Sequence, residues 1–587
     1  MMPSTSDPSG PEKGSSLRRW GPIVAIVAVL ALIAVVVVVS GGGDDNDTST
    51  ATTAAGQPGT TGGSDSTGTT ASGPGGTAPP DSGSAAISFS EAEALGLDVT
   101  FPDTCDLDRG RVAIPNYFAP ECYANIDGDN GGATAPGVTG DTIKIGLYSA
   151  PESDPVLDFI LGSIQSDDTS AEGVATAQGF IDMFNAMYQT YGRHVELDVI
   201  QGSGSSTDEA AARADAIRAA DDGVFAVLGG PALNSAWTEE MNARGIPCIG
   251  CFGVPDPAPN VFSITASTDQ TRVQLVEYIS KKLAGKPAVH AGDEAFQTTE
   301  RNFGMLWLQA SDASQQEADD TVAALAAEGV TVSESVPFDL TRASEQATGI
   351  IQRFKDAGVT SIIISGDPST PAIFTQAATD QEYFPEWIIG GSALMDTTAF
   401  ARTYDQQQWA HAFGISSLTA RLSPDVVGSA QELYEWFNGE PPPADDSVGV
   451  ILPGPQVFFN ALQEAGPDLT VESFENALLS IAPGPASLTT VRFSYGDHDL
   501  YPTIPGPDYA GIDDFTEIWY DPDVTGVVDE IGHEGQGAYQ YVDGGRRYLP
   551  GEWTTDDKAF DPDGAVAIYD TPPPGEEAPD YPSPAGG

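Results

Sequence analysis

Basic residues are scarce in this chain. Of its 587 residues, 24 are Lys or Arg and 85 are Asp or Glu, for a formal net charge of -61 at pH 7. Nucleic-acid phosphates and anionic lipid headgroups are bound by clustered Lys and Arg. The composition therefore excludes a nucleic-acid partner and argues against adsorption to anionic lipid. Such acidity is typical of a protein kept soluble in a salty or calcium-rich exterior, and it names no substrate.

Cysteine is scarce too, with four in the chain. They form two local pairs in sequence, Cys105 with Cys122 and Cys248 with Cys251, although four cysteines allow three connectivities. Two local structural disulfides are favoured and fit an oxidising exterior. For the Cys-x-x-Cys pair, zinc and redox chemistry remain alternatives. Zinc would need two more ligands, and a redox dithiol would be expected at a helix N-terminus rather than after the predicted strand IPCIG.

The sequence shows no recognisable metal-binding or catalytic motif. The Asp-rich stretch NIDGDNGG fails as an EF-hand, because Gly131 and Val138 stand where ligands are needed. The chain has no Gly-x-Ser-x-Gly elbow and no P-loop. The sequence therefore predicts no metal site, no cofactor and no enzyme activity. The five histidines are scattered without metal-ligand spacing: His194, His290, His411, His498 and His533.

One long apolar run lies near the N-terminus. Residues 21–39, GPIVAIVAVLALIAVVVVV, carry no charge, and a helix of that length just spans a hydrocarbon core of about 30 Å. Basic residues precede the run and acidic residues follow it. The positive-inside rule then predicts a cytoplasmic segment at 1–20, a transmembrane anchor at 21–40 and an extracytoplasmic remainder. A cleaved signal peptide is the alternative, although no small-x-small cleavage site follows.

Two segments lack the apolar residues that a core requires. Residues 41–86 are almost all Gly, Ser, Thr, Ala, Pro and Asp, which predicts a disordered linker. Residues 561–587, with a Pro-Pro-Pro run, predict a disordered tail. Residues 87–136 are expected to form an N-terminal extension with one disulfide, and residues 526–560 a C-terminal extension.

Residues 137–525 alternate between short apolar runs and segments of helical period. Two successive series of this kind predict an α/β fold with two doubly wound, Rossmann-like lobes, each on a parallel sheet. No sequence repeat is visible, so any duplication is architectural. Predicted strands are 142–149, 194–200, 224–228 and 246–250, then 261–265, 287–291, 330–338, 361–365 and 387–390. Predicted helices are 172–191, 208–220, 234–243, 269–283 and 345–357, with another from Pro371.

Several segments resemble one known family. They include GVTGDTIKIG at 137–146, GVFAVLGG at 223–230, QVFFNALQEAG at 456–466 and FTEIWYD at 515–521. In this order and spacing they are similar to the branched-chain amino-acid (Leu/Ile/Val-type) substrate-binding proteins of ABC transporters. The resemblance covers roughly residues 137–525. It implies a type I periplasmic-binding fold that closes on a small ligand.

The chain also departs from this family. Gln201 stands where the second strand usually ends in an acidic residue, and Phe262-Ser263 stands where Phe-Arg is expected. The first loop, 150–170, is long and acidic, and the stretch 302–335 matches weakly. Because some of these loops contact ligand in the family, the departures bear on the substrate more than on the fold.

Candidate ligand residues follow from the fold. In open parallel sheets, ligands bind outside the C-terminal ends of the strands, where helix N-termini offer N–H groups. The resemblance implies that the loop after 224–228 holds a ligand carboxylate, although a turn and an N-cap are the alternative roles there. The first-lobe candidates are Tyr148, Ser149, Gly230, Pro231, Asn234, Ser235, Phe252 and Gly253.

In the second lobe, Asp367 and Ser369 follow the predicted strand SIIIS. Amino-acid-binding relatives place an acidic residue near this point against the ligand ammonium, so the resemblance implies that role for Asp367. A helix cap is the alternative. Phe296 is expected to stack on the ligand from the crossover.

Together these features predict an extracytoplasmic, membrane-anchored solute-binding protein at the cell membrane. It would capture an amino acid, an amide or a related carboxylate, with an ABC permease as its expected partner. A cell-surface sensor or scaffold with the same fold is one alternative. An extracellular hydrolase is another, but it would need a nucleophile with a base, or a metal.

Overall fold

The structure is a computed structural model. The segments predicted as cytoplasmic N-terminus, anchor and linker lie outside its described residues, except for Ala86. Within the described part of the chain, no helix is long and apolar enough to cross a membrane. The described residues are 86–126, 128–231, 234–251, 258–309, 312–391 and 394–586.

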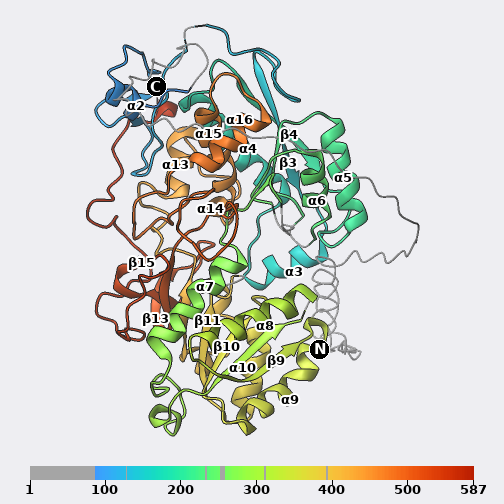
Figure 1. Ribbon diagram of the computed structural model, residues 1–587, viewed down its shortest axis with the longest axis vertical. Helices are drawn as coiled ribbons and strands as arrows, with labels where there is room; N and C mark the ends of the chain where they lie inside the picture. Colours follow the sequence, from blue (N-terminus) through green and yellow to red (C-terminus); the bar gives the residue numbers. More distant parts are fainter. Residues whose placement is uncertain are drawn as a thin grey trace, which may run out of the picture.

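The first lobe is built on a parallel sheet with the strand order β4-β3-β5-β6-β7 (Figure 1). Each of these strands was predicted from sequence, with ends that differ by a few residues. The prediction, however, began the second lobe with 261–265, whereas β7 pairs with β6 in the first sheet. The strands are β3 (Thr142–Ser149), β4 (His194–Gln201), β5 (Ala226–Leu228), β6 (Cys248–Ile249) and β7 (Val261–Phe262). The helices between them are α3 (Pro155–Ser163), α4 (Ser170–Met187), α5 (Glu209–Asp221) and α6 (Ala236–Arg244).

Helix α4 shows why these segments are helical. A capping box of Thr169 and Glu172 pairs the free N–H groups at its start. Phe180 and Phe184, four residues apart, lie on one face and are fully buried. They pack against Phe458 and other residues from late in the chain. The late helices are α13 (Ala430–Asn438), α14 (Val448–Ile451), α15 (Pro453–Ala465) and α16 (Val471–Ser480).

The second lobe is built on a mixed sheet with the order β14-β13-β12-β11-β10-β8-β9, and β15 pairs with β13. Strands β8 to β12 pair in parallel, whereas β13, β14 and β15 pair antiparallel. The prediction of a wholly parallel sheet is therefore wrong for this lobe. Residues 526–560 supply β14 and β15 and therefore belong to this sheet. The strands are β8 (Phe303–Leu308), β9 (Val332–Phe338), β10 (Ser361–Ser365), β11 (Glu386–Gly390), β12 (Ala412–Ser416), β13 (Phe515–Val528), β14 (Glu534–Tyr541) and β15 (Arg547–Tyr548).

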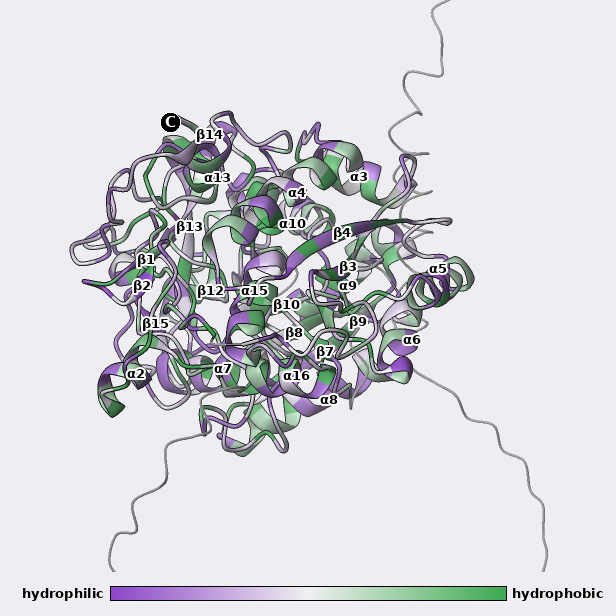
Figure 2. Ribbon diagram, turned by 90° about the horizontal axis from the view of Figure 1, so that it is seen from above, coloured by the Kyte–Doolittle hydropathy of each residue, from purple (hydrophilic) through white to green (hydrophobic). Residues whose placement is uncertain are grey.

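Helices cover both faces of this second sheet. They are α7 (Thr268–Tyr278), α8 (Asp312–Ala327), α9 (Ala343–Asp356) and α10 (Thr370–Asp380), with short α11 (Thr398–Ala401) and α12 (Gln406–Trp409). Two buried clusters lie on the two sides of the sheet, since Ile362 and Ile364 of β10 belong to one and Ile363 to the other. Figure 2 shows hydrophobic and hydrophilic residues alternating along the helices and strands.

The strand expected between the predicted elements 269–283 and 330–338 was put in the wrong place. Residues 287–291 form no strand and make only one isolated bridge, between Pro287 and Glu300. The strand is β8, whose sequence FGMLWL is a buried apolar run beside β10 and β9. The prediction rested on the weakly apolar run PAVHA, whereas five of the six residues of β8 are buried.

Both predicted disulfides are confirmed. Cys105 is bonded to Cys122 in the N-terminal extension, which also contains α2 (Phe89–Leu95), β1 (Cys105–Asp106) and β2 (Arg111–Val112). Cys248 is bonded to Cys251 at the end of β6, where both residues are buried. The second bridge leaves no thiolate there for zinc, and its buried place at a strand end fits a structural role.

The prediction of a disordered tail is wrong for residues 561–586. Val566 pairs with Tyr541 of β14, and Tyr569 pairs with Leu422. The last residues form a short 3-10 helix, Pro584–Gly586, beside α13. The composition correctly indicates that this segment has no core of its own. It is ordered because it forms hydrogen bonds with residues of both lobes.

Three crossovers join the lobes: residues 263–267, 417–429 and 496–514. The first and third lie side by side. Ser263 N donates to Tyr509 O over 2.8 Å, and Gly511 N donates to Ser263 O over 2.9 Å. Buried backbone groups must be paired, so these bonds hold the crossovers in register.

A half-buried carboxyl group, Asp508, and a buried one, Asp513, flank this pairing. The Asp508 carboxylate accepts from Gln270 Nε2 of α7 over 2.6 Å and from Ala510 N over 2.8 Å. Asp513 Oδ2 accepts from Ser494 Oγ over 2.8 Å. Burial raises the pKa of Asp508 to about 6. Burial, with the nearby Asp508 and Asp514 charges, raises the pKa of Asp513 to about 8.

The crossover region should therefore lose stability as pH rises. Folded Asp513 keeps a proton that the unfolded chain releases above about pH 4, so the free energy of unfolding falls with pH up to the folded pKa. Asparagine at this position does not titrate. As pH rises from about 6 to about 9, we therefore expect the free energy of unfolding of Asp513→Asn to gain about 2 kcal/mol on that of the native chain, measured by urea unfolding. Asp497→Asn, at an exposed position of the same crossover, is the control and should show no such gain. Parallel pH profiles for Asp513→Asn and the native chain would contradict this assignment.

A buried ion pair lies at the N-terminal ends of the second-lobe strands, on the side of the sheet away from the crossovers. Arg301 and Glu386 are fully buried, with Nε to Oε2 at 2.7 Å and Nη2 to Oε1 at 2.9 Å. Ser361 Oγ and His290 N also donate to Glu386, over 2.6 and 3.1 Å. The carboxylate thus joins β11 to β10 and to the segment before β8.

Glu386→Gln should destabilise the protein by about 3–5 kcal/mol, because it leaves the Arg301 charge buried without its partner. Chemical denaturation measures this loss. Glu334→Gln, which breaks the more exposed pair with Arg353, is the matched control and should cost less than about 1 kcal/mol. Equal losses for the two variants would mean that burial does not set the strength of the Arg301 pair.

Candidate functional site

The two lobes have the same strand order. Numbered from the first strand of each lobe, β4-β3-β5-β6-β7 and β9-β8-β10-β11-β12 both read 2-1-3-4-5. In such sheets the ligand site lies beyond the C-terminal ends of the strands, at the switch point between the first and third strands. Crossovers leave the C-terminal ends of β7 and β12, so these edges of both sheets border the region between the lobes.

Tyr148 and Ser149 end β3 at the first switch point, as predicted. The Tyr148 ring meets the Trp237 ring edge-on, with centroids 5.3 Å apart. Burial and the nearby Asp215 charge raise the pKa of Tyr148 to about 12, so its hydroxyl stays protonated near neutral pH. Ser149 is buried, and its carbonyl accepts from Gly202 N over 2.8 Å.

Gly230 and Pro231 follow β5 at the same edge. A Cβ atom on Gly230 would lie 2.7 Å from Trp237 Cδ1. The loop can therefore approach the indole this closely only with glycine at that position. This contact places Trp237, in the first turn of α6, directly beside the predicted glycine loop.

Asn234 and Ser235 serve the start of α6. Asn234 Nδ2 donates to Ser206 O over 2.8 Å, and its Oδ1 accepts from Ala236 N over 3.1 Å. Ser235 Oγ donates to Glu239 Oε1 over 2.7 Å. Both side chains are buried, and their polar atoms bond to neighbouring residues of the first lobe. These contacts fit the alternative raised from sequence, in which the residues form a turn and cap the helix.

Two polar atoms that sequence analysis did not single out are buried here without a hydrogen-bond partner. They are the indole Nε1 of Trp237 and the hydroxyl of Ser206. Both residues are almost completely buried, and an unpaired buried donor costs free energy comparable to a lost hydrogen bond. A signal was present in sequence, since Trp237 opens the helix after a Gly-Gly loop.

The long acidic first loop contains helix α3, which lies between the two lobes (Figure 1). Before it, the buried Asp154 accepts from Ser206 N over 2.5 Å, which ties α3 to the first lobe. Just after it, Ile164 packs against the second-lobe core that contains Leu306 and Phe338. The loop therefore bridges the lobes at their C-terminal edges.

In the second lobe, Asp367 and Ser369 lie beyond β10 at its switch point. Asp367 Oδ1 accepts from the amides of Ser369 and Thr370, over 2.9 and 3.0 Å, and from the Ser369 hydroxyl. Its Oδ2 accepts from Thr370 Oγ1 over 2.7 Å. The carboxylate thus caps the start of α10. Phe252 and Gly253 lie outside the described residues.

Phe296 is not at the ligand edge, and that prediction is wrong. Its ring packs against Tyr383, with centroids 5.9 Å apart, and Tyr383 precedes β11. Phe296 itself precedes β8, so it lies at the N-terminal edge of the second sheet. The error follows from the misplaced strand at 287–291, which would have carried Phe296 to the opposite edge.

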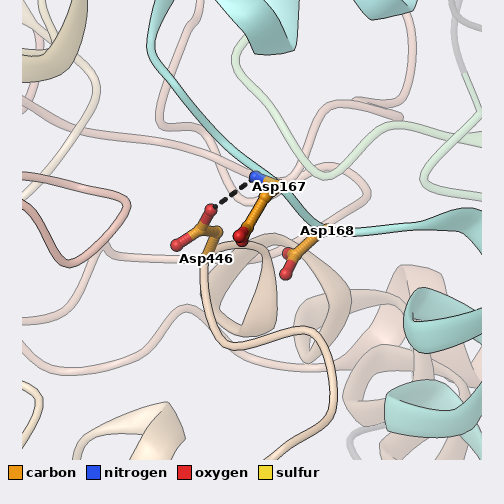
Figure 3. A group of neighbouring side chains, drawn as sticks. All are labelled: Asp167, Asp168 and Asp446. Atoms are coloured by element: carbon orange, nitrogen blue, oxygen red, sulfur yellow. Dashed lines mark hydrogen bonds between the residues drawn. The ribbon is translucent and has the colours of Figure 1, made fainter. Parts of the chain in front are cut away.

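Three carboxylates gather where the connection from α3 to α4 meets the start of α14 (Figure 3). The ligand atoms of Asp167, Asp168 and Asp446 all lie within 4.8 Å of one another. Asp446 Oδ2 accepts from Asp167 N over 3.3 Å. Burial and the neighbouring acidic charges raise the pKa of Asp168. The backbone hydrogen bond offsets part of the mutual repulsion, and the cluster alone assigns no metal.

Comparison with solved structures finds proteins of low sequence identity, and the three described here have TM-scores below 0.5. A fatty acid ABC transporter substrate-binding protein from Thermomonospora curvata is 18% identical over 66% of this chain and 90% of its own, with a TM-score of 0.44. A branched-chain amino acid transporter substrate-binding protein from Streptococcus pneumoniae, in complex with isoleucine, is 14% identical over 68% and 100%, with a TM-score of 0.44. An ABC transporter substrate-binding protein from Sphaerobacter thermophilus is 16% identical over 70% and 98%, with a TM-score of 0.47.

A search of curated proteins finds no match. The sequence model of the family described as "Periplasmic binding protein" matches residues 161–500. This match covers more than half of the chain and contains most of both doubly wound lobes. It confirms the family that the sequence motifs predicted, and the protein belongs to the periplasmic binding protein family.

Proposed function

We propose that this chain is an extracytoplasmic solute-binding protein that holds a small molecule between its lobes and delivers it, chemically unchanged, to an ABC permease. The observation that carries the proposal is the pair of switch points at the inter-lobe edges of two sheets with the same strand order. Hinged closure of two lobes about a ligand is a known use of such architecture. Residues 21–40 are the proposed membrane anchor, and the two disulfides support an oxidising location.

The first-lobe switch point supplies the recognition groups in this proposal. Trp237 Nε1 and the Ser206 hydroxyl have no partner there, and the neutral Tyr148 hydroxyl is a third donor. These donors suit a ligand carboxylate or amide carbonyl, and the Tyr148 and Trp237 rings suit apolar groups next to it. Asp367 already accepts four hydrogen bonds, so an ammonium group would have to share that carboxylate.

The direct test is thermal unfolding of the full chain against a panel of amino acids, amides and small aliphatic and aromatic carboxylates. A ligand at 100 times its dissociation constant stabilises the native state by about 2.7 kcal/mol. We expect a saturable rise in midpoint for one chemical class, with the ligand recovered unchanged. Consumption of the ligand would favour the hydrolase alternative. A flat response across the panel would count against solute capture and favour a scaffold.

Gly230→Ala tests the position of the site. The new Cβ would displace the Trp237 ring, so we expect the bound ligand to lose at least about tenfold in affinity, near 1.4 kcal/mol, in calorimetric titration. Gly173→Ala is the control, because Gly173 lies in α4 with open space around its Cβ position. Unchanged affinity in Gly230→Ala would place the ligand away from the β5 loop.

A further inference from the structure

The C-terminal segment, residues 561–586, begins on the second lobe. Val566 N and O pair with Tyr541 of β14, over 3.1 and 2.7 Å. Tyr569 Oη donates to Gly544 O over 2.8 Å, and its ring packs against the core of that lobe. This end is therefore bound to the lobe that holds β8–β15.

The segment then follows the second crossover, residues 417–429, toward the first lobe. Tyr569 N donates to Arg421 O over 2.9 Å, and Ser423 N donates to Tyr569 O over 2.8 Å, in a parallel pairing. Further on, the Glu576 carboxylate accepts from Leu488 N over 2.9 Å and Thr489 Oγ1 over 2.6 Å. The C-terminal segment and the second crossover thus run side by side from the second lobe to the first.

The far end is bound to the first lobe and to the N-terminal extension. Trp436 Nε1 of α13 donates to Tyr581 O over 3.0 Å, and Ser583 Oγ donates to Trp436 O over 2.6 Å. Tyr581 Oη donates to Asp106 Oδ2 over 2.5 Å and accepts from Arg109 Nη1 over 3.2 Å. Asp106 adjoins the Cys105–Cys122 disulfide. Figure 1 shows this red segment rising past β15 to the region of α2.

The link between the two ends is stiff. Pro572, Pro573, Pro574 and Pro579 lie between Tyr569 and Tyr581. Each proline fixes its own backbone φ angle, and a turn closed by Glu576 N donating to Pro573 O over 3.0 Å further restricts the link. A stiff link anchored on both lobes cannot follow a large rotation at the hinge without losing contacts at one end.

We propose that residues 561–586 are an inter-lobe strap, a fourth link beside the three crossovers that narrows the range of lobe angles. The strap also joins lobe motion to the disulfide-bonded N-terminal extension. This inference goes beyond solute capture and does not depend on which ligand binds, because it concerns the ligand-free protein.

The test measures distances between lobes in the full chain by spin-label resonance. All four native cysteines are in disulfides, so Ala210→Cys on α5 and Gln352→Cys on α9, both exposed, take the labels selectively. The strap variant combines Glu576→Ala with Tyr581→Ala, which removes the contacts to Leu488 and Thr489 and the hydroxyl contacts at the far end. Asp580→Asn, an exposed strap residue, is the matched control.

We expect a broader distribution of inter-lobe distances in the strap variant and a native distribution in Asp580→Asn. A native distribution in the strap variant would overturn the proposal. If the double variant fails to fold, Tyr581→Phe keeps the ring and removes only the hydroxyl contacts. It should then give a smaller broadening, and its absence would equally overturn the strap. Because no ligand is added, either result is independent of the ligand panel.

Discussion

The pairing of the first and third crossovers is the constraint on which the two-lobed arrangement depends. Ser263 exchanges backbone hydrogen bonds with Tyr509 and Gly511 where the chain passes between lobes. Since unpaired buried backbone groups are costly, this ladder fixes where the chain can bend. It also keeps the C-terminal edges of the two sheets at the inter-lobe region. The half-buried Asp508 and the buried Asp513 flank it, and their surroundings raise the pKa of both carboxyl groups, to about 6 and about 8.

At the candidate site, most polar side chains already have structural partners. Asn234 and Ser235 bond within the start of α6, and Asp367 accepts from the start of α10. Helix N-termini leave free N–H groups, and nearby Asn, Ser and Asp side chains satisfy them first. The groups without partners, Trp237 Nε1 and the Ser206 hydroxyl, are therefore the ones to which the proposed function assigns recognition.

Helix α3 and the strap connect the lobes in addition to the crossovers. Helix α3 does so at the ligand edge, from Asp154 in the first lobe to Ile164 against the second. The strap does so along the second crossover and ends on α13 and the N-terminal extension. Both lie in segments that depart from the family pattern or extend beyond it. The features peculiar to this chain thus concentrate on how its lobes are joined.

The sequence by itself determined the alternation of strands and helices, because buried strands such as SIIIS and helices such as α4 carry local periodicity. It also favoured the two local disulfides, which the structure then confirmed, and it placed Tyr148, Gly230 and Asp367 at strand ends. Only the tertiary structure decided that β8 lies at 303–308, that Phe296 lies at the far edge and that the tail is ordered. The physical reason is that these outcomes depend on partners far away in sequence. A short apolar run does not reveal which strands it pairs with, and a proline-rich tail without its own core is ordered only by hydrogen bonds to both lobes.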